Sequence, residues 1–514
     1  MNSLLEESAP PSPPAPLPQA GEGRPRSVPH AGVRGDDALA SAPSAVSPPL
    51  SGGRIGWGPL ENKGLLALAL IYLLALATIF KPWVHGIDGA GYYAWVRSAV
   101  IDRDLDTYNE FQHYEGAQDE ELQSTAWRNF FRRTETGLWS NHYPVGSAVL
   151  WSPFFLLAHA LTRFLNLAGY GIAPDGYSSL YVAFSTFGST VAAFVGLVLI
   201  YRIARGPYGD CTATLATASI WLASPLVFYM YMHPSMSHAN DAFVNALFVW
   251  VWYATRRART GKGWLALGLA GGLAALVRTQ NVLLMVFPGL ELLRELITAL
   301  RQRSTMNGLR SVGKGCIFAI AFLVAFAPQM LVWKAVFGSY IVLNPQQVSS
   351  GYGFNLWSPN FLNALFSSNH GLFIWNPLLL PATLGVWLLA RKERRLALLL
   401  MTTFLLQLYV IGSWVAWHGT VAFGARFFVN SVPMFVLGLA ALADRLRQRV
   451  PPAVLAAAAG AFVAWNFLLI VQYALQLIPR AGPVSIAQMV SNQFTVVPRS
   501  LSKVIGLLIA RLSR

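Results

Sequence analysis

The sequence predicts an all-α membrane protein, a polytopic bundle of about 11 transmembrane helices with a large extracytoplasmic first loop that carries interfacial helices. Of its 514 residues, 54% are hydrophobic and only 12% are charged, about half the charge of a typical soluble domain. Apolar runs of roughly 18–25 residues recur, and each is long enough to cross the hydrocarbon core of a bilayer. The net charge of +15 lies mainly in short basic loops between these runs, which indicates membrane topology and no nucleic-acid partner.

Residues 1–60 contain no early apolar core and are rich in Pro, Ser, Ala and Gly, unlike a signal peptide. A segment of this composition cannot bury enough surface to fold, so it is predicted to be a disordered tail held in the cytoplasm by Arg54 and Lys63. The predicted domain boundaries are a tail at 1–60, a transmembrane domain at 61–477 and a C-terminal tail at 478–514 with an amphipathic segment at 501–512.

About eleven of the apolar runs are predicted to span the membrane. They cover residues 64–82, 178–203, 211–230, 240–255, 264–279, 281–299, 315–337, 371–390, 396–415, 425–443 and 453–477. Basic clusters at 256–259, 301–314, 391–395 and 445–449 mark the cytoplasmic ends. The N-terminus is then cytoplasmic, and the two sizeable outer loops are 83–177 and 338–370.

A further apolar run at 144–165 does not fit the alternation of sides. Counting back from Arg256 puts both residue 85 and Tyr177 on the outer side, so a helix between them cannot be a simple span. The run contains Pro144 and Pro153, and we predict that it lies in, or dips into, the outer leaflet. The alternative is that it spans the membrane and that the positive-inside rule fails locally.

Asp88 is the acid of the first outer loop that stands closest to the end of the first span. Glycines surround it and Tyr92 follows, so the carboxylate is expected at the membrane surface beside apolar groups. This placement is typical of a general base that acts at the lipid–water boundary. The alternative is that Asp88 is the N-cap of a helix that begins near Gly89.

Asp102, Asp104 and Asp106 resemble the start of a calcium-binding loop. The pattern then fails, because Thr107 and His113 stand where such a loop needs Gly and Glu. A divalent cation held with Glu110 is one interpretation, and a solvated loop in which Arg103 pairs with the acids is the favoured one. The metal content of the protein is left open by the sequence.

Histidines occupy two further places on the outer side. His142, followed by Tyr143 and Pro144, is expected to face the same cavity as Asp88, and the alternative is a plain loop histidine. Tyr143 is a further candidate for contact with the substrate. His233, His238 and Asp241 lie at the mouth of another helix, where they could bind a metal or hydrogen-bond a polar substrate. The spacing of the two histidines is not that of a helical ligand pair, so we favour contact with substrate through His238 and Asp241.

Two arginines lie at outer helix ends, against the positive-inside trend. Arg278 and Arg426 each need a partner at the membrane, and a phosphate is a fitting one because guanidinium binds it bidentately. The alternative for each is snorkelling to the interface. His418 precedes Arg426, and the loop at 338–370 carries aromatic and amide side chains, Tyr352 among them, that suit a sugar.

These features together resemble the GT-C class of integral membrane glycosyltransferases, which includes the protein O-mannosyltransferases and the aminoarabinose transferase of lipid A. The resemblance lies in the first span and its acidic outer loop with Asp88 near the start, in the Tyr143-Pro144 helix within that loop, and in the outer loop at 338–370. It covers the layout of residues 64–445, and its motifs are short and degenerate.

The resemblance implies transfer of a sugar from a polyprenyl-phosphate or polyprenyl-diphosphate carrier to a lipid, glycan or protein acceptor, at the outer face of a bacterial inner membrane. Asp88 would deprotonate the acceptor hydroxyl, and Arg278 and Arg426 would hold the leaving phosphate. The chain departs from the family in two places. Gly89 follows Asp88 where paired acids are common, and His142-Tyr143-Pro144 replaces a Lys-Pro-Pro motif, so the donor and any divalent cation stay open.

Two other functions compete with this one. A transporter or lipid flippase would carry charged residues in the middle of spans, along a pathway. A glycan polymerase or ligase would share the outer aromatic surface and differ only in its acceptor.

Overall fold

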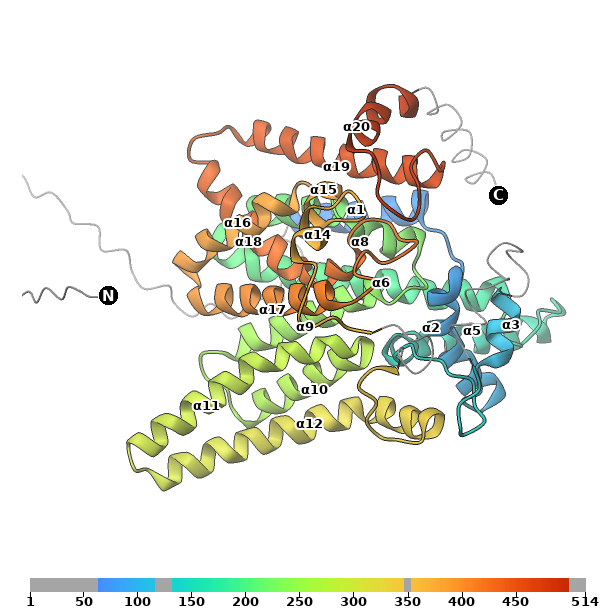
Figure 1. The fold of residues 1–514 in the computed structure, drawn as a ribbon, viewed down its shortest axis with the longest axis horizontal. Coiled ribbons are helices and arrows are strands. Elements are labelled where there is room, and N and C mark those ends of the chain that lie inside the picture. Colours follow the sequence, from blue (N-terminus) through green and yellow to red (C-terminus); the bar gives the residue numbers. More distant parts are fainter. Residues whose placement is uncertain (1–62, 116–131, 346–352, 499–514) are drawn as a thin grey trace, which may run out of the picture. The chain divides into compact units, whose positions relative to one another are not determined.

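The computed structural model describes residues 63–115, 132–345 and 353–498, and the regular elements in these ranges are all helices (Figure 1). The longer ones are α1 (Lys63–Ile79), α2 (Gly86–Arg97), α3 (Tyr108–Glu115), α5 (Gly146–Leu167), α6 (Ser179–Tyr208), α7 (Asp210–Leu222), α9 (His238–Thr255), α10 (Gly261–Val277), α11 (Val286–Arg301), α12 (Thr305–Phe337), α16 (Leu379–Lys392), α17 (Arg394–Ser413), α18 (Val432–Leu446), α19 (Pro452–Ala474) and α20 (Ile486–Phe494). Short turns link them: η1 (Ser98–Asp102), α8 (Pro225–Val227), η2 (Phe228–Met232), η3 (Thr279–Met285), α14 (Phe361–Phe366), α15 (Leu372–Trp375) and η4 (Arg426–Ser431). The all-α prediction is confirmed.

Six helical segments of the described chain are long and apolar enough to cross a membrane: α5, α6, α12, α17, α18 with η4, and α19. The count rises to seven if α7 and the bent segment after it, Pro225–Met232, form one broken span. Helices α1 and α10 are apolar but shorter. The chain is thus built as a multi-pass membrane protein, and the predicted count of about 11 spans is not confirmed.

Ion pairs join the helix ends that the sequence assigns to the cytoplasm. Arg256 pairs with Glu393 at 2.8 Å, and Arg259 pairs with Glu291 at 2.5 Å. At the start of α1, the Gly64 amide donates to the Asp210 carboxylate at 2.9 Å. These contacts bring the basic loops together at one end of the bundle, which we call the basic end.

The opposite end of the bundle collects the loops that the sequence assigns to the outside. After α1, the Lys81 amide donates to the Tyr231 carbonyl at 2.8 Å and the Trp83 indole donates to the Met232 carbonyl at 2.6 Å. The chain then enters α2, which carries Asp88. We call this end of the bundle, opposite the basic end, the Asp88 end. Because α1 starts at the basic end, its exit here agrees with the predicted alternation.

Helix α5 packs along the first part of α6. Trp151 donates to the Ser189 hydroxyl at 2.8 Å, and His159 is hydrogen-bonded to Tyr181 at 2.7 Å. Ser189 in turn donates to the Pro234 carbonyl at the Asp88 end. These contacts favour the predicted place in the outer leaflet. By length and composition α5 also qualifies as a span, so its position across the membrane stays a prediction.

Two glycines allow close contacts that a side chain would block. A Cβ on Gly91 of α2 would lie 2.0 Å from the Tyr143 ring, so only glycine lets that ring rest on the helix. At the crossing of α16 and α18, a Cβ on Gly438 would lie 2.1 Å from the Ala382 carbonyl oxygen. Small residues at such crossings allow helices in a membrane to pack backbone to backbone.

Candidate active site

Asp88 is the third residue of α2, in the first turn of the helix. The helix begins at Gly86 and its N-cap residue is His85, so the alternative that Asp88 caps a helix from Gly89 is wrong. The Tyr143 hydroxyl donates a 2.5 Å hydrogen bond to Asp88 Oδ1, and Arg426 forms an ion pair with Oδ2. The carboxylate is therefore held from both sides.

Arg426 comes from η4, 338 residues further along the chain, and its side chain is 9% exposed. Its Nη1 also lies 3.8 Å from the sulfur of Met236. Its Nε is buried and has no hydrogen-bond partner among the described residues. The predicted base and one of the predicted phosphate ligands thus form an ion pair, in a site where an unpaired charge would be costly.

Tyr143 is anchored to α2 through its backbone. The Trp95 indole donates to the Tyr143 carbonyl at 2.8 Å, and the Asn141 amide group donates to the Gly91 carbonyl at 2.9 Å. The Tyr143 amide donates to the Asn141 side chain at 3.1 Å. The phenol that contacts Asp88 is consequently fixed by the same helix that carries Asp88.

The charges of Asp88 and His142 follow from this environment. Burial raises the pKa of Asp88, but the Arg426 charge and the hydrogen bonds from Tyr143 and Arg426 outweigh it and hold the pKa below its ordinary value. Burial lowers the pKa of His142 to about 4, although the Asp88 charge acts in the opposite direction. At neutral pH the site holds a carboxylate anion beside an uncharged imidazole.

Arg278 lies next to this pair and has its own partners. Its Nε is 3.6 Å from the Asp241 carboxylate, and its Nη1 is 3.1 Å from His238 Nδ1. The guanidinium carbons of Arg278 and Arg426 lie 5.3 and 5.2 Å from the centre of the same Phe427 ring. Two cations therefore share one aromatic ring at the Asp88 end.

Asp241 is buried and belongs to a set of amide side chains that the sequence did not reveal in full. Its Oδ1 accepts hydrogen bonds from Asn245 at 2.9 Å and from Asn281 at 2.7 Å. Asn245 follows Asp241 by one helical turn, a spacing that could have been noticed. Gln407 of α17 accepts a hydrogen bond of 3.1 Å from Gln280, the residue before Asn281. No local sequence pattern links Gln407 to the site. Asp241 lies beside Arg278, and its predicted contact with a substrate stays a prediction.

The amide set borders a small cleft. Its polar lining includes Asn245, Gln407 and Asn430, and the amide nitrogen of Asn430 is buried there without a partner among the described residues. Leucines 283, 284 and 400 form much of the remaining wall. The cleft places polar groups between apolar helices, next to the side chains that hold Arg278.

The structure places the remaining predicted residues as follows. The Tyr92 ring is buried 4.8 Å from the Tyr143 ring, and His418 accepts a hydrogen bond from the Thr420 amide at 3.1 Å. His233 meets the His85 ring edge-on and His238 contacts Arg278, so they do not converge as metal ligands. No group of three His, Cys, Asp or Glu side chains in the described chain could hold a metal ion. Tyr352 lies outside the described residues.

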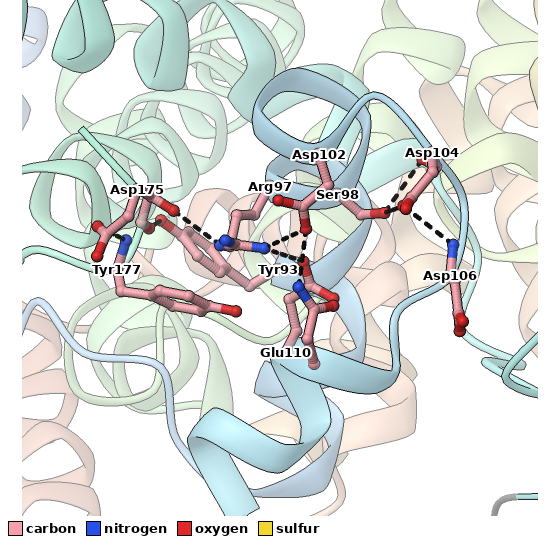
Figure 2. A network of polar contacts seen from close by, with 11 residues as sticks. Tyr93, Arg97, Ser98, Asp102, Asp104, Asp106, Glu110, Asp175 and Tyr177 are labelled. Atoms are coloured by element: carbon pink, nitrogen blue, oxygen red, sulfur yellow. Dashed lines mark hydrogen bonds and ion pairs between the residues drawn. The ribbon is translucent and has the colours of Figure 1, made fainter. Parts of the chain in front are cut away.

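A second polar network fixes the acidic part of the first loop (Figure 2). The Arg97 guanidinium contacts Asp102 at 2.5 Å and Glu110 at 2.6 Å, and so lies where a divalent ion would need to be. Asp106 pairs with Arg133 at 2.8 Å. The interpretation that Arg103 pairs with these acids is wrong, because Arg97 and Arg133 hold them and Arg103 forms no ion pair with a described residue.

Glu110 of this network is 0% exposed. Burial raises its pKa to about 7, against the opposing effect of Arg97.

The described part of the outer loop at 338–370 is anchored away from this network, because its Asn355 amide donates to the Ser413 carbonyl at 2.6 Å. Trp357 of that loop is 98% exposed, so its ring is accessible but is no part of the enclosed site.

No protein-family model and none of the curated proteins matches the chain. Among solved structures it is similar to ArnT from Cupriavidus metallidurans in the apo state, with a TM-score of 0.45, 14% identity, and coverage of 87% of this chain and 71% of that one. The same protein bound to undecaprenyl phosphate gives a TM-score of 0.43, 14% identity, and 87% and 76% coverage.

The chain is also similar to the oligosaccharyltransferase from Archaeoglobus fulgidus in complex with zinc and sulfate. That TM-score is 0.42 at 14% identity, with coverage of 82% of this chain and 58% of that one. These likenesses are at 14% identity throughout and say nothing of this chain's family or substrate.

Proposed function

We propose that the chain is a membrane glycosyltransferase that moves a sugar from a polyprenyl-phosphate-linked donor to an acceptor hydroxyl at the extracytoplasmic face of a bacterial inner membrane. The observation that carries the proposal is the contact between Asp88 and Arg426, with Arg278 on the same Phe427 ring. An acid and two buried or half-buried cations at one end of the bundle would supply a base and an anion site together.

The proposed reaction is a single displacement. The acceptor oxygen forms a bond to the anomeric carbon while the bond from that carbon to the phosphate oxygen breaks, so the configuration inverts. Asp88 receives the acceptor proton, and the polyprenyl phosphate leaves with the electron pair. Arg426 and Arg278 stabilise the negative charge that grows on the phosphate, because guanidinium groups in a water-poor site act strongly on developing charge.

The surrounding residues have more limited roles in this proposal. Tyr143 orients Asp88, and Asp241 holds Arg278 with its amide neighbours. The uncharged His142, with His238, His418 and Tyr92, would offer hydrogen bonds to sugar hydroxyls or to the acceptor. The proposal assigns the charge roles to the arginines, and no step passes through a metal ion.

The rival functions fit the charge distribution less well. In the described chain the ion pairs lie at the two ends of the bundle, with Arg256–Glu393 and Arg259–Glu291 at the basic end and Arg278–Asp241 and Arg426–Asp88 at the other. A transporter would need charged groups along a path between the ends. A glycan polymerase or ligase would use the same site, and only the acceptor would distinguish it.

The test is transfer by the purified full-length protein in detergent, with undecaprenyl-phosphate-linked sugars as donors. We expect Asp88→Asn to lower kcat by roughly 10²- to 10⁴-fold, the usual contribution of a general base. Asp106→Asn is the matched control, since Asp106 lies in the same loop but pairs with the half-exposed Arg133. Undiminished transfer by the Asp88 variant would rule out its role as the base.

A further inference from the structure

The ion pair between Asp88 and Arg426 occupies both of the groups that the proposed reaction needs. Arg426 cannot give its full charge to a phosphate while Nη1 is bound to Asp88. Asp88 is a weak base while the same contact stabilises its anion, since a base works best when its pKa lies near the working pH. In this arrangement each group restrains the other.

A phosphate is the ligand best suited to separate them. It presents several anionic oxygens to a guanidinium, whereas Asp88 uses one oxygen of its carboxylate on Arg426. The Arg426 Nε is buried and has no partner among the described residues, so one donor of the guanidinium is still unused. Arg278, beside the same Phe427 ring, adds a second cation that attracts the same anion.

We propose that the donor phosphate displaces Asp88 from Arg426, so that Asp88 becomes the reactive base only when the donor is in place. This inference rests on the proposed function and adds the regulation of its site. It predicts that phosphate binding at Arg426 and proton binding at Asp88 favour each other. Such coupling between two sites is reciprocal by thermodynamic linkage.

The rest of the site determines what happens to the released carboxylate. Its Oδ1 keeps the hydrogen bond from Tyr143, whose backbone is anchored on α2, so Asp88 stays in position and Oδ2 becomes available. Burial then acts without the opposing cation, and it raises the pKa of Asp88 toward the working range. The charged and titratable groups around the pair are Arg278, Tyr92, Tyr143, Tyr229, Tyr473, His142, His233, His238, His370 and His418. Of these only Arg278 is charged at neutral pH.

The first experiment measures the affinity of the full-length protein for undecaprenyl phosphate. If Asp88 competes for Arg426, then Asp88→Asn binds this lipid more tightly than the wild type, by roughly five- to 150-fold. Glu135→Gln removes one exposed negative charge from the same loop and should leave the affinity unchanged. Tyr143→Phe should also give no gain, because it leaves the Arg426 contact in place. Equal or weaker binding by the Asp88 variant overturns the inference.

The second experiment needs no substitution, in case the Asp88 variant fails to fold with Arg426 unpaired. Farnesyl methyl phosphate carries a single acidic group that stays ionised throughout, so any proton taken up on binding goes to the protein. Titration calorimetry in buffers of different ionisation enthalpy should show proton uptake at about pH 5 that declines by about pH 8. Binding without proton uptake at any pH in this range overturns the inference.

The outcomes separate this inference from the function beneath it. If neither lipid binds, or if Arg426→Gln and Arg278→Gln bind as the wild type does, the phosphate site itself is wrong. If the arginine variants lose affinity while Asp88→Asn gains none and no proton is taken up, the glycosyltransferase proposal stands and only the displacement of Asp88 fails.

Discussion

Asp88 receives two hydrogen-bond donors of different kinds. Tyr143 is uncharged and belongs to a segment clamped on α2, whereas Arg426 is charged and arrives from η4. The first donor can set the position of the carboxylate at all stages of a reaction. The second is open to exchange with a stronger anion, so Tyr143 fixes the position of Asp88 while Arg426 makes the larger contribution to lowering its pKa.

Tyr143→Phe tests the orienting role. Without the phenol, the carboxylate loses a hydrogen bond to its charged form, so the pKa of Asp88 rises. We expect the acidic limb of the kcat–pH profile, measured at saturating donor, to move to higher pH and the maximal kcat to fall by roughly tenfold. Tyr108→Phe, a tyrosine of the same loop outside the site, serves as the control, and an unmoved limb would contradict the assignment.

Glu110 gives a pH-dependent stability at the same scale. Its pKa in the folded chain, about 7, is above the ordinary value of 4.5, so the protonated form favours folding. The stabilisation is fully present below about pH 4.5 and is lost as the pH rises through about 7. In detergent, the free energy of unfolding of Glu110→Gln should therefore vary less over this pH window than that of the wild type, by on the order of 2 kcal/mol. An equal pH dependence in the variant and the wild type would contradict the role of Glu110.

The sequence pointed to individual residues where their type was anomalous for the place. Arginines at outer helix ends and a lone acid among glycines stand out against membrane statistics, and these led to Asp88, Arg278 and Arg426. The sequence could not predict which side chains form ion pairs, because Asp88 and Arg426 are 338 residues apart and no local pattern joins them. Arg97 was also overlooked as the partner of Asp102 and Glu110, although these acids lie only five and 13 residues further along the chain.

At the scale of elements, the crossing of α16 and α18 depends on glycine. Gly438→Val would place carbon atoms against the Ala382 carbonyl and force the helices apart. Overpacking of this kind costs about 1–3 kcal/mol, so the apparent Tm in detergent should fall by several degrees. Gly460→Val on α19 is the matched control, since a Cβ there meets no described atom within 4 Å. A similar fall in both variants would show that the crossing is not the cause.

The element boundaries show what an apolar run can and cannot predict. The run at 315–337 is apolar throughout, but the helix that contains it, α12, begins ten residues earlier at Thr305. Arg310 and Lys314 lower the hydropathy of those early turns without breaking the helix, and Ser304 caps its start. Helix α2 likewise starts at Gly86, ahead of the predicted Gly89, because glycine at a helix start gives little sequence signal.

For the whole molecule, the alternation of sides is the main prediction still to be tested. We expect Tyr170→Cys and Trp357→Cys, both at exposed positions, to react with a membrane-impermeant maleimide in intact cells. Gln448→Cys at the basic end should react only after permeabilisation. The exposed thiols Cys211 and Cys316 are first replaced by serine. Labelling of residue 170 from the inside would mean that α5 crosses the membrane.

The fold class followed from composition because a bilayer leaves a chain of this hydropathy little choice but helices. The predicted alternation of sides was enough to place the distant loops of the Asp88 end on one face of the membrane. The arrangement within that face did not follow, because helix packing depends on side-chain fit over many residues. The tails at 1–60 and 501–512 lie outside the described residues, and the boundaries at 61–477 and 478–514 stay predictions.

The length of α12 has a consequence for the lipid around the protein. Its 33 residues extend about 50 Å, whereas the hydrocarbon core is about 30 Å thick. Tilt within the usual range cannot absorb the difference, so the basic N-terminal turns project past the core together with the end of α11. Leu300, Met306 and Leu309 are exposed on this hairpin beside Arg301 and Arg310. Such a hairpin rests in the headgroup layer, and its depth, and with it the setting of α10 and Arg278, is expected to change with the acyl-chain length of the bilayer.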